Sequence, residues 1–147
     1  MEEPEGMRTT PLGLVRWIAW AQRKGGEDWV RSRDLTPEQA FVLGYLVQSP
    51  GAIQRDIADV SRTSPASVSS LVKGLERRLL VERRSEDGDE RRKRVYATPE
   101  GQQLVAGFTE AMAEVDDAIL DPLDADEQAQ LLALLTKVTS QLAPPRR

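Results

Sequence analysis

Four dipeptides that pair a hydroxyl residue with proline divide this chain into segments and constrain its fold more than any other feature. They are Thr10-Pro11, Thr36-Pro37, Ser64-Pro65 and Thr98-Pro99. A serine or threonine side chain caps free backbone N–H groups at the start of a helix, and proline is favoured at the first helical position. Thr36 is followed three residues later by Gln39, which completes a capping box. Each dipeptide therefore predicts a helix start.

Apolar residues recur near the helical period of 3.6 after each of these starts. Residues 11–24 are apolar over most of the helix circumference, so this helix is predicted to be buried on more than one side until Gly25-Gly26 breaks it. The other helices are predicted at residues 37–48, 52–60, 65–78, 99–119 and 124–142.

The apolar period changes in the middle of the chain. Two short strands are predicted at residues 80–84 and 93–97, on either side of a polar tip at 85–92 with an Asp87-Gly88 turn signal. A short helix, a tight turn at 61–64, a second helix and a charged hairpin make a winged helix-turn-helix. The predicted fold class is therefore mostly α with a small β-hairpin.

The chain has no cysteine and no histidine. Disulfides, thiolate metal sites, histidine bases and histidine-ligated zinc are therefore excluded. No glycine-rich phosphate loop is present, so we expect no enzyme, no cofactor and no metal. No segment approaches the roughly 18 apolar residues of a membrane span, and no signal peptide is visible. We expect a cytoplasmic protein.

The net charge of −4 hides an asymmetry along the chain. Residues 51–94 carry 11 basic and 8 acidic side chains, a net charge of +3, whereas 1–50 sum to −1 and 95–147 to −6. Neutralising phosphates releases counterions near the contact, so local charge decides nucleic-acid affinity. The basic middle segment is compatible with DNA binding, although basic side chains can also simply solvate a surface.

The predicted helix at 65–78 has two different faces. Its inner face consists of Val68, Leu71, Val72 and Leu75. Its outer face consists of Ala66, Ser67, Ser69, Ser70, Lys73, Gly74 and Arg77. Small side chains allow close approach to DNA, hydroxyls bond base edges, and lysine or arginine binds phosphates. The alternative is that the serines occur there because the face is solvated.

Several short motifs occur in a specific order along the chain. They lie at residues 35–39, 50–51, 57–58, 64–72, 75–78, 80–83, 89–91 and 95–101. The wing pattern D-x-R-x-x-x-L-x-L-T is matched in register by Asp89, Arg91, Val95 and Thr98, with Ala97 in place of the second leucine. In this combination the sequence resembles the multiple-antibiotic-resistance regulator (MarR) family of bacterial transcription factors, over roughly residues 10–142.

The resemblance implies a homodimeric regulator, expected to be a repressor, that binds a pseudo-palindromic operator. Helix 65–78 would enter the major groove and wing 85–92 the minor groove, and a small-molecule effector would release the DNA. The expected organisation is a flexible start (1–9), a dimerisation helix region (10–34), the winged helix-turn-helix (35–98), C-terminal dimerisation helices (99–142) and a flexible tail (143–147).

The resemblance implies that Arg91 is the minor-groove residue and that Asp89 orients it. The predicted DNA-contacting residues are Gln54, Arg62, Ser64, Ala66, Ser67, Ser69, Ser70, Lys73, Arg77, Asp89, Arg91, Arg92 and Arg94. Two positions depart from the family pattern. Ser70 stands where many members have an arginine, and Leu79 stands where many have a glycine, so a different ending of helix 65–78 is expected.

The resemblance also implies an effector pocket, often for anionic aromatic compounds. Candidate lining residues are Trp17, Trp20, Phe41 and Tyr45, which otherwise belong to the core or to a dimer interface. The alternative function is a winged-helix module for protein interaction or RNA binding, without specific operator binding.

Overall fold

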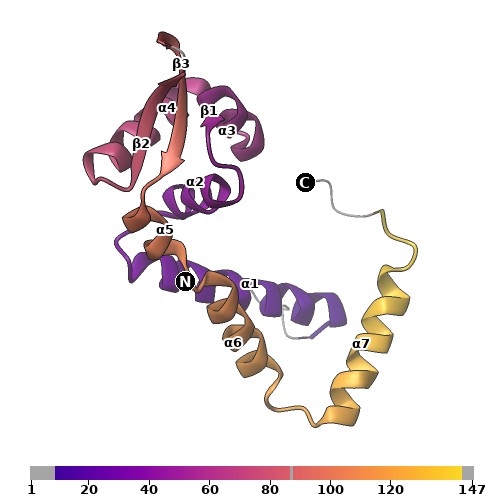
Figure 1. Cartoon of the computed structure of the whole chain (residues 1–147). Helices are drawn as coiled ribbons and strands as arrows, with labels where there is room; N and C mark the ends of the chain where they lie inside the picture. The colour runs from indigo at the N-terminus through magenta and orange to yellow at the C-terminus, as the bar shows by residue number, and fades with distance from the viewer. Residues whose placement is uncertain (1–8, 87, 144–147) are drawn as a thin grey trace. The chain divides into compact units, whose positions relative to one another are not determined.

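The structure is a computed structural model that describes residues 9–86 and 88–143. It is mostly helical, with one small antiparallel sheet (Figure 1), so the predicted fold class is confirmed. Its helices are α1 (Pro11–Arg31), α2 (Pro37–Gln48), α3 (Gln54–Ser61), α4 (Pro65–Arg77), α5 (Pro99–Val105), α6 (Phe108–Leu120) and α7 (Ala125–Thr139). Its strands are β1 (Ala52–Ile53), β2 (Val81–Glu86) and β3 (Asp89–Ala97).

All four hydroxyl–proline dipeptides begin a helix, as predicted. In each case the hydroxyl oxygen accepts a hydrogen bond from the backbone N–H three residues later, at 3.0 to 3.2 Å. Thr36 also donates its own backbone N–H to the side chain of Gln39 at 3.0 Å, which completes the predicted capping box. The start of each of these helices is therefore encoded locally.

The predicted break at Gly25-Gly26 is wrong, because α1 continues to Arg31. Glycine in a helix interior costs roughly 1 kcal/mol relative to alanine, which a helix tolerates when other contacts hold it. Lys24 and Asp28 form an ion pair of 2.9 Å across this pair of glycines, and Val30 is buried beyond it. These contacts support the last turns of α1.

The predicted helix at 99–119 is divided into α5 and α6. Ala106 has extended backbone angles and Gly107 has a φ of +83°, a left-handed conformation that glycine adopts without steric cost. Apolar spacing continued across this point and concealed the break. The predicted helix at 52–60 likewise begins two residues later, since Ala52 and Ile53 form the short strand β1.

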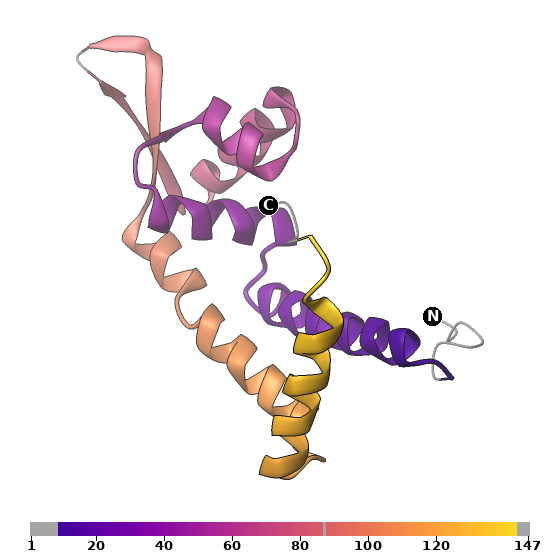
Figure 2. The same cartoon turned by 90° about the vertical axis from the view of Figure 1, so that its right-hand side faces the viewer.

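The sheet has the order β1-β3-β2, with all neighbours antiparallel. Both hairpin strands extend further than predicted, into the segment 85–92 that was expected to be a polar tip. Ser85 pairs with Lys93, and Glu86 pairs with Asp89 after a register shift. Ser85 and Glu86 at the end of β2 are both exposed, so this part of the strand has no alternation of buried and exposed residues from which its end could be predicted. Figure 2 shows the hairpin projecting past the helices of the same unit.

The chain divides into two compact units, one comprising Arg23–Ala111 and the other the residues before and after it. Within the described residues, every buried apolar side chain lies in the unit Arg23–Ala111. This core is formed by Val30, Leu35, Val42, Leu43, Leu46, Ala52, Ile57, Ala58, Val68, Val72, Leu75, Leu80, Val81, Val95 and Ala97. The core therefore holds the helix-turn-helix and the base of the hairpin together.

Candidate nucleic-acid interface

Helix α4 separates an apolar face from a polar one. Val68, Val72 and Leu75 are fully buried, while Leu71 on the same side is half-buried. Of the outer residues that were predicted to contact DNA, Ser69 is half-buried. The exposed ones are Ala66, Ser67, Ser70, Lys73 and Arg77. This face is small and uncharged at the start of the helix and cationic further on.

The turn before α4 is fixed by its own polar groups. Arg62 adopts a left-handed conformation, with φ at +54°, and is exposed. The hydroxyl of Ser61 lies 2.7 Å from the carbonyl oxygen of Ile57 and 2.8 Å from the hydroxyl of Thr63. Ser64 caps α4 through the backbone N–H of Ser67, and its hydroxyl also lies 2.9 Å from that of Ser67. Arg62, Ser64 and Ser67 are thus positioned together at one end of α4.

The hairpin is the second part of the predicted interface. Arg94 donates from Nε to Glu86 at 2.7 Å and from Nη1 to the carbonyl oxygen of Gly51 at 3.0 Å. The hydrogen bond that Arg94 donates to Glu86 raises the pKa of the Arg94 guanidinium. Arg94 therefore ties the hairpin to the segment before β1. The side chains of the predicted contacts Asp89, Arg91 and Arg92 lie outside the described residues, as does Asp87.

Sequence analysis did not anticipate a side-chain link between α4 and the hairpin. Arg83 in β2 forms an ion pair with Glu76 in the last turns of α4, at 2.6 Å between Nη2 and Oε2. This hydrogen bond lowers the pKa of the Glu76 carboxyl. The two residues are seven positions apart across a change of secondary structure, so neither the helical nor the strand period identifies them as partners.

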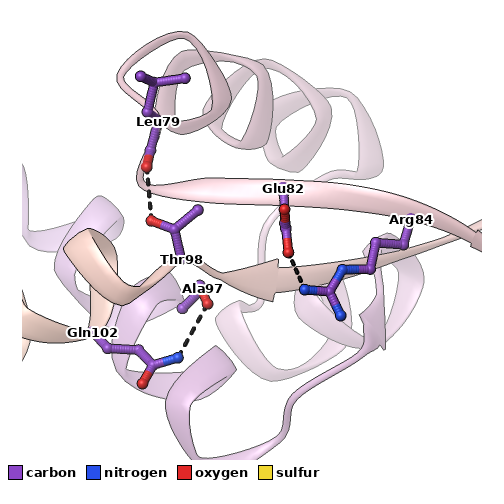
Figure 3. A network of polar contacts seen from close by, with 6 residues as sticks. All are labelled: Leu79, Glu82, Arg84, Ala97, Thr98 and Gln102. Atoms are coloured by element: carbon purple, nitrogen blue, oxygen red, sulfur yellow. Dashed lines mark hydrogen bonds and ion pairs between the residues drawn. The ribbon is translucent and has the colours of Figure 1, made fainter.

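Helix α4 ends in a left-handed turn, and the expected change of ending at Leu79 is wrong. Leu79 has a φ of +59° and an exposed side chain, and the N–H of Leu80 reaches the carbonyl oxygen of Leu75 at 3.0 Å. Thr98 donates its hydroxyl to the carbonyl oxygen of Leu79 at 2.7 Å, which secures the turn against the start of α5 (Figure 3). Leucine thus occupies a conformation that strongly favours glycine.

The four effector candidates are divided between the two units. The rings of Trp17 and Trp20 in α1 are tilted by 39° to each other with centroids 5.4 Å apart, and Tyr45 is half-buried against the core of the other unit. Phe41 is 49% exposed and lines an open groove of about 360 Å³ beside the turn between α3 and α4. The same groove is lined by Val60, Arg62, Ser67 and Leu71.

Within residues 9–86 and 88–143, no group of three acidic side chains is arranged to hold a metal ion. In the same part of the chain, no helix combines the length and the apolar character needed to cross a membrane.

Comparisons with known proteins agree with this geometry. Residues 33–92, from the start of the helix-turn-helix to the hairpin, match the sequence model of the MarR family. The transcriptional regulator HosA of Escherichia coli O157:H7 is 30% identical over 105 residues, which cover 71% of this chain and 78% of HosA.

Solved structures of MepR, a transcription regulator of the Staphylococcus aureus multidrug efflux pump MepA, are also similar. One of them is 33% identical with a TM-score of 0.81, over 91% of this chain and 99% of that chain. A MepR–DNA complex is 34% identical with a TM-score of 0.73, over 88% of this chain and 98% of that chain. The fold, the polar outer face of α4 and these relatives lead to one conclusion: the chain is a DNA-binding transcriptional regulator and belongs to the MarR family.

Proposed function

We propose that this protein is a homodimeric repressor that binds a pseudo-palindromic operator, with α4 in the major groove and the hairpin in the minor groove. The observation that carries the proposal is the outer face of α4, where Ser67, Ser70 and Lys73 are exposed opposite a buried apolar face. Serine hydroxyls bond base edges, and lysine binds phosphate. In this role the protein has no catalytic step and works in the cytoplasm, on the nucleoid when bound to DNA.

The proposed dimer is supported by apolar side chains that the single chain leaves exposed. They are Leu12, Leu14, Val15, Ile18 and Trp20 in α1 and Leu132, Leu134, Leu135 and Val138 in α7. Large exposed apolar surfaces mark protein interfaces, and a second copy of this chain is the partner that an operator with two half-sites requires. Two α4 helices would then lie about 34 Å apart, one turn of DNA.

The proposal is tested by titrating the protein with duplex DNA from the region upstream of its own gene. We expect Arg91→Ala to weaken binding about tenfold or more without loss of folding, because an arginine in the minor groove meets concentrated negative potential. Lys137→Ala in α7 is the matched control, since it removes a cation from the other unit.

Two outcomes of the titration would contradict the proposal. Affinity that does not fall as salt rises would exclude several phosphate contacts. RNA that competes as well as the duplex would instead favour an RNA-binding module.

We further propose that a small aromatic molecule releases the DNA. The groove beside Phe41 supports this, because a ligand there would press on Arg62 and Ser67, which are proposed to face DNA. Compounds that release the operator from the wild-type protein are expected to lose potency with Phe41→Ala but not with Trp17→Ala. Equal potency against both variants would place the effector elsewhere.

A further inference from the structure

One ion pair joins the two parts of the molecule that are proposed to enter the two grooves of DNA. The guanidinium of Arg83 in β2 presents two N–H donors to the two carboxylate oxygens of Glu76 in α4, at 2.6 Å (Nη2–Oε2) and 3.3 Å (Nε–Oε1). The side chains are only 23% (Arg83) and 37% (Glu76) exposed. A planar, two-point contact of this kind fixes orientation as well as distance.

Both residues of this ion pair are attached to parts of the backbone that are held by the core. Glu76 follows the fully buried Leu75 in α4, and Arg83 is paired in the sheet with the fully buried Val95. The intervening chain is a short turn through Leu79, held by Thr98. Because the ion pair closes this turn, α4 and β2 are joined by backbone at one point and by side chains at another, which resists a change of the angle between them.

Glu76 places a negative charge close to the proposed DNA-binding surface. Its carboxylate lies in the field of three cations on three elements: Arg83 on β2, Lys93 on β3 and Lys73 on α4. A negative charge beside Lys73, which is proposed to bind phosphate, opposes DNA binding on electrostatic grounds alone. Any favourable contribution of Glu76 to operator affinity therefore has a source other than its charge.

We propose that Glu76 and Arg83 are positioning residues, which hold the hairpin at the angle to α4 that lets both engage the operator at once. In this arrangement Arg83 acts on DNA through Glu76 and is not itself a phosphate contact. Because the angle is already fixed in the free protein, binding does not have to order the hairpin relative to α4. This gain in affinity applies only where both α4 and the hairpin contact the DNA. This inference rests on the proposed function, since it concerns the affinity for a specific operator.

The test uses a substitution for which the two explanations, positioning and charge, predict opposite changes in operator affinity. Glu76→Gln removes a negative charge near DNA, so electrostatics alone would strengthen binding. If the pair positions the hairpin, the full-length variant should instead bind the operator about tenfold more weakly. The slope of log affinity against log salt should stay unchanged because no phosphate contact is lost. Affinity for random duplex DNA should not fall.

Arg83→Lys provides a second, independent variant. Lysine keeps the positive charge but loses the two-point contact, so it should weaken operator binding as much as Glu76→Gln does. The double variant should be no weaker than either single variant, because the two residues act as one unit. Glu82→Gln is the matched control: Glu82 pairs with Arg84 in the same strand (Figure 3) and does not reach α4, so its operator affinity should stay near wild type.

Unfolding by heat, followed by circular dichroism, shows whether each variant is folded at the temperature of the titration. The inference is overturned if Glu76→Gln binds the operator as tightly as wild type or more tightly. It is also overturned if Arg83→Lys retains full affinity, or if operator and random DNA are weakened equally. Failure of the wild-type protein to prefer any upstream duplex would overturn the proposed function itself, which is a separate result.

Discussion

The two units of this chain contrast in what covers their apolar side chains. In Arg23–Ala111 a core forms within one chain, and nine of the described side chains are almost fully inaccessible to water. In the other unit, α7 has no buried residue among those described, although its leucines recur at helical spacing. Apolar residues at helical spacing therefore do not by themselves show that a helix is buried within its own chain. The apolar face of α4 is covered inside the fold, while the exposed apolar side chains of α7 are the ones proposed to form the dimer.

The largest expected effect tests the unit that lacks its own core. Leu135→Asp places a charge in the exposed apolar stripe of α7, and a buried unpaired carboxylate in an interface is strongly unfavourable. We expect the dimer to dissociate and operator affinity to fall at least about 100-fold. Sedimentation velocity and DNA titration measure the two effects.

The matched control for this substitution is Gln130→Asp, which adds the same charge at an exposed polar position of α7. A Leu135→Asp protein that sediments like wild type would show that α7 faces water in the active form.

The next effect tests the unit that has its own core. A Cβ atom on Gly101 would overlap the carbonyl oxygen of Leu80, at the contact between α5 and the base of the hairpin. Because the obstacle is backbone, Gly101→Ala should lower the free energy of unfolding by about 3 kcal/mol. Denaturant unfolding gives the value.

Gly44→Ala is the corresponding control in α2, because its Cβ meets no atom within 4 Å. This control should stabilise the protein by about 0.5–1 kcal/mol, since alanine favours a helix. Similar values for the two substitutions would mean that α5 does not pack closely on the hairpin base.

A smaller effect is expected at the end of α4. Leu79 has a left-handed backbone and is 73% exposed, so its side chain contributes strain and little burial. Leu79→Gly should stabilise the protein by about 0.5–1 kcal/mol, after the entropy of glycine in the unfolded chain is subtracted. Leu79→Ala keeps the Cβ and the strain, and should leave the melting temperature nearly unchanged. A loss of stability in Leu79→Gly would indicate that the leucine side chain is covered in the dimer.

The smallest effect concerns acid. The ion pair with Arg83 lowers the pKa of Glu76 below its ordinary value of 4.5. A carboxyl with a depressed folded-state pKa stabilises the fold above its unfolded pKa and loses that contribution as pH falls through the folded value. The stability difference between wild type and Glu76→Gln should therefore be constant at neutral pH and shrink below about pH 4.5. If the stability difference between wild type and Glu76→Gln does not change with pH, ionisation of Glu76 does not contribute to the stability of the fold.

Much of this fold could be predicted from local signals in the sequence. Features that depend on contacts between helices and strands could not. The starts of α1, α2, α4 and α5 follow from a hydroxyl cap and a proline, both of which act within four residues. The continuation of α1 through two glycines depends in part on the burial of Val30 in the core, and the length of the hairpin depends on the pairing of β2 with β3.

The same distinction holds for the candidate site. The polar outer face of α4 could be recognised from spacing, because side chains three and four positions apart share a face. The pair Glu76–Arg83 could not, since it exists only once the turn at Leu79 places β2 against α4. The engagement of Arg94 by Glu86 and Gly51 was likewise hidden, as it depends on sheet register.

The strained turn at Leu79 also bears on how such a regulator can change. If α4 contacts the operator as proposed, a change of operator preference requires substitutions on its outer face, and most substitutions reduce stability. In this chain a leucine stands where glycine would relax the backbone. One further substitution at Leu79 could therefore raise the stability of the fold and offset such a loss. Leu79 lies at the far end of α4 from Ser64, Ala66 and Ser67, so a substitution there leaves these proposed DNA contacts unchanged. In evolutionary terms, a stabilising change at the end of α4 would allow the residues at its start to vary.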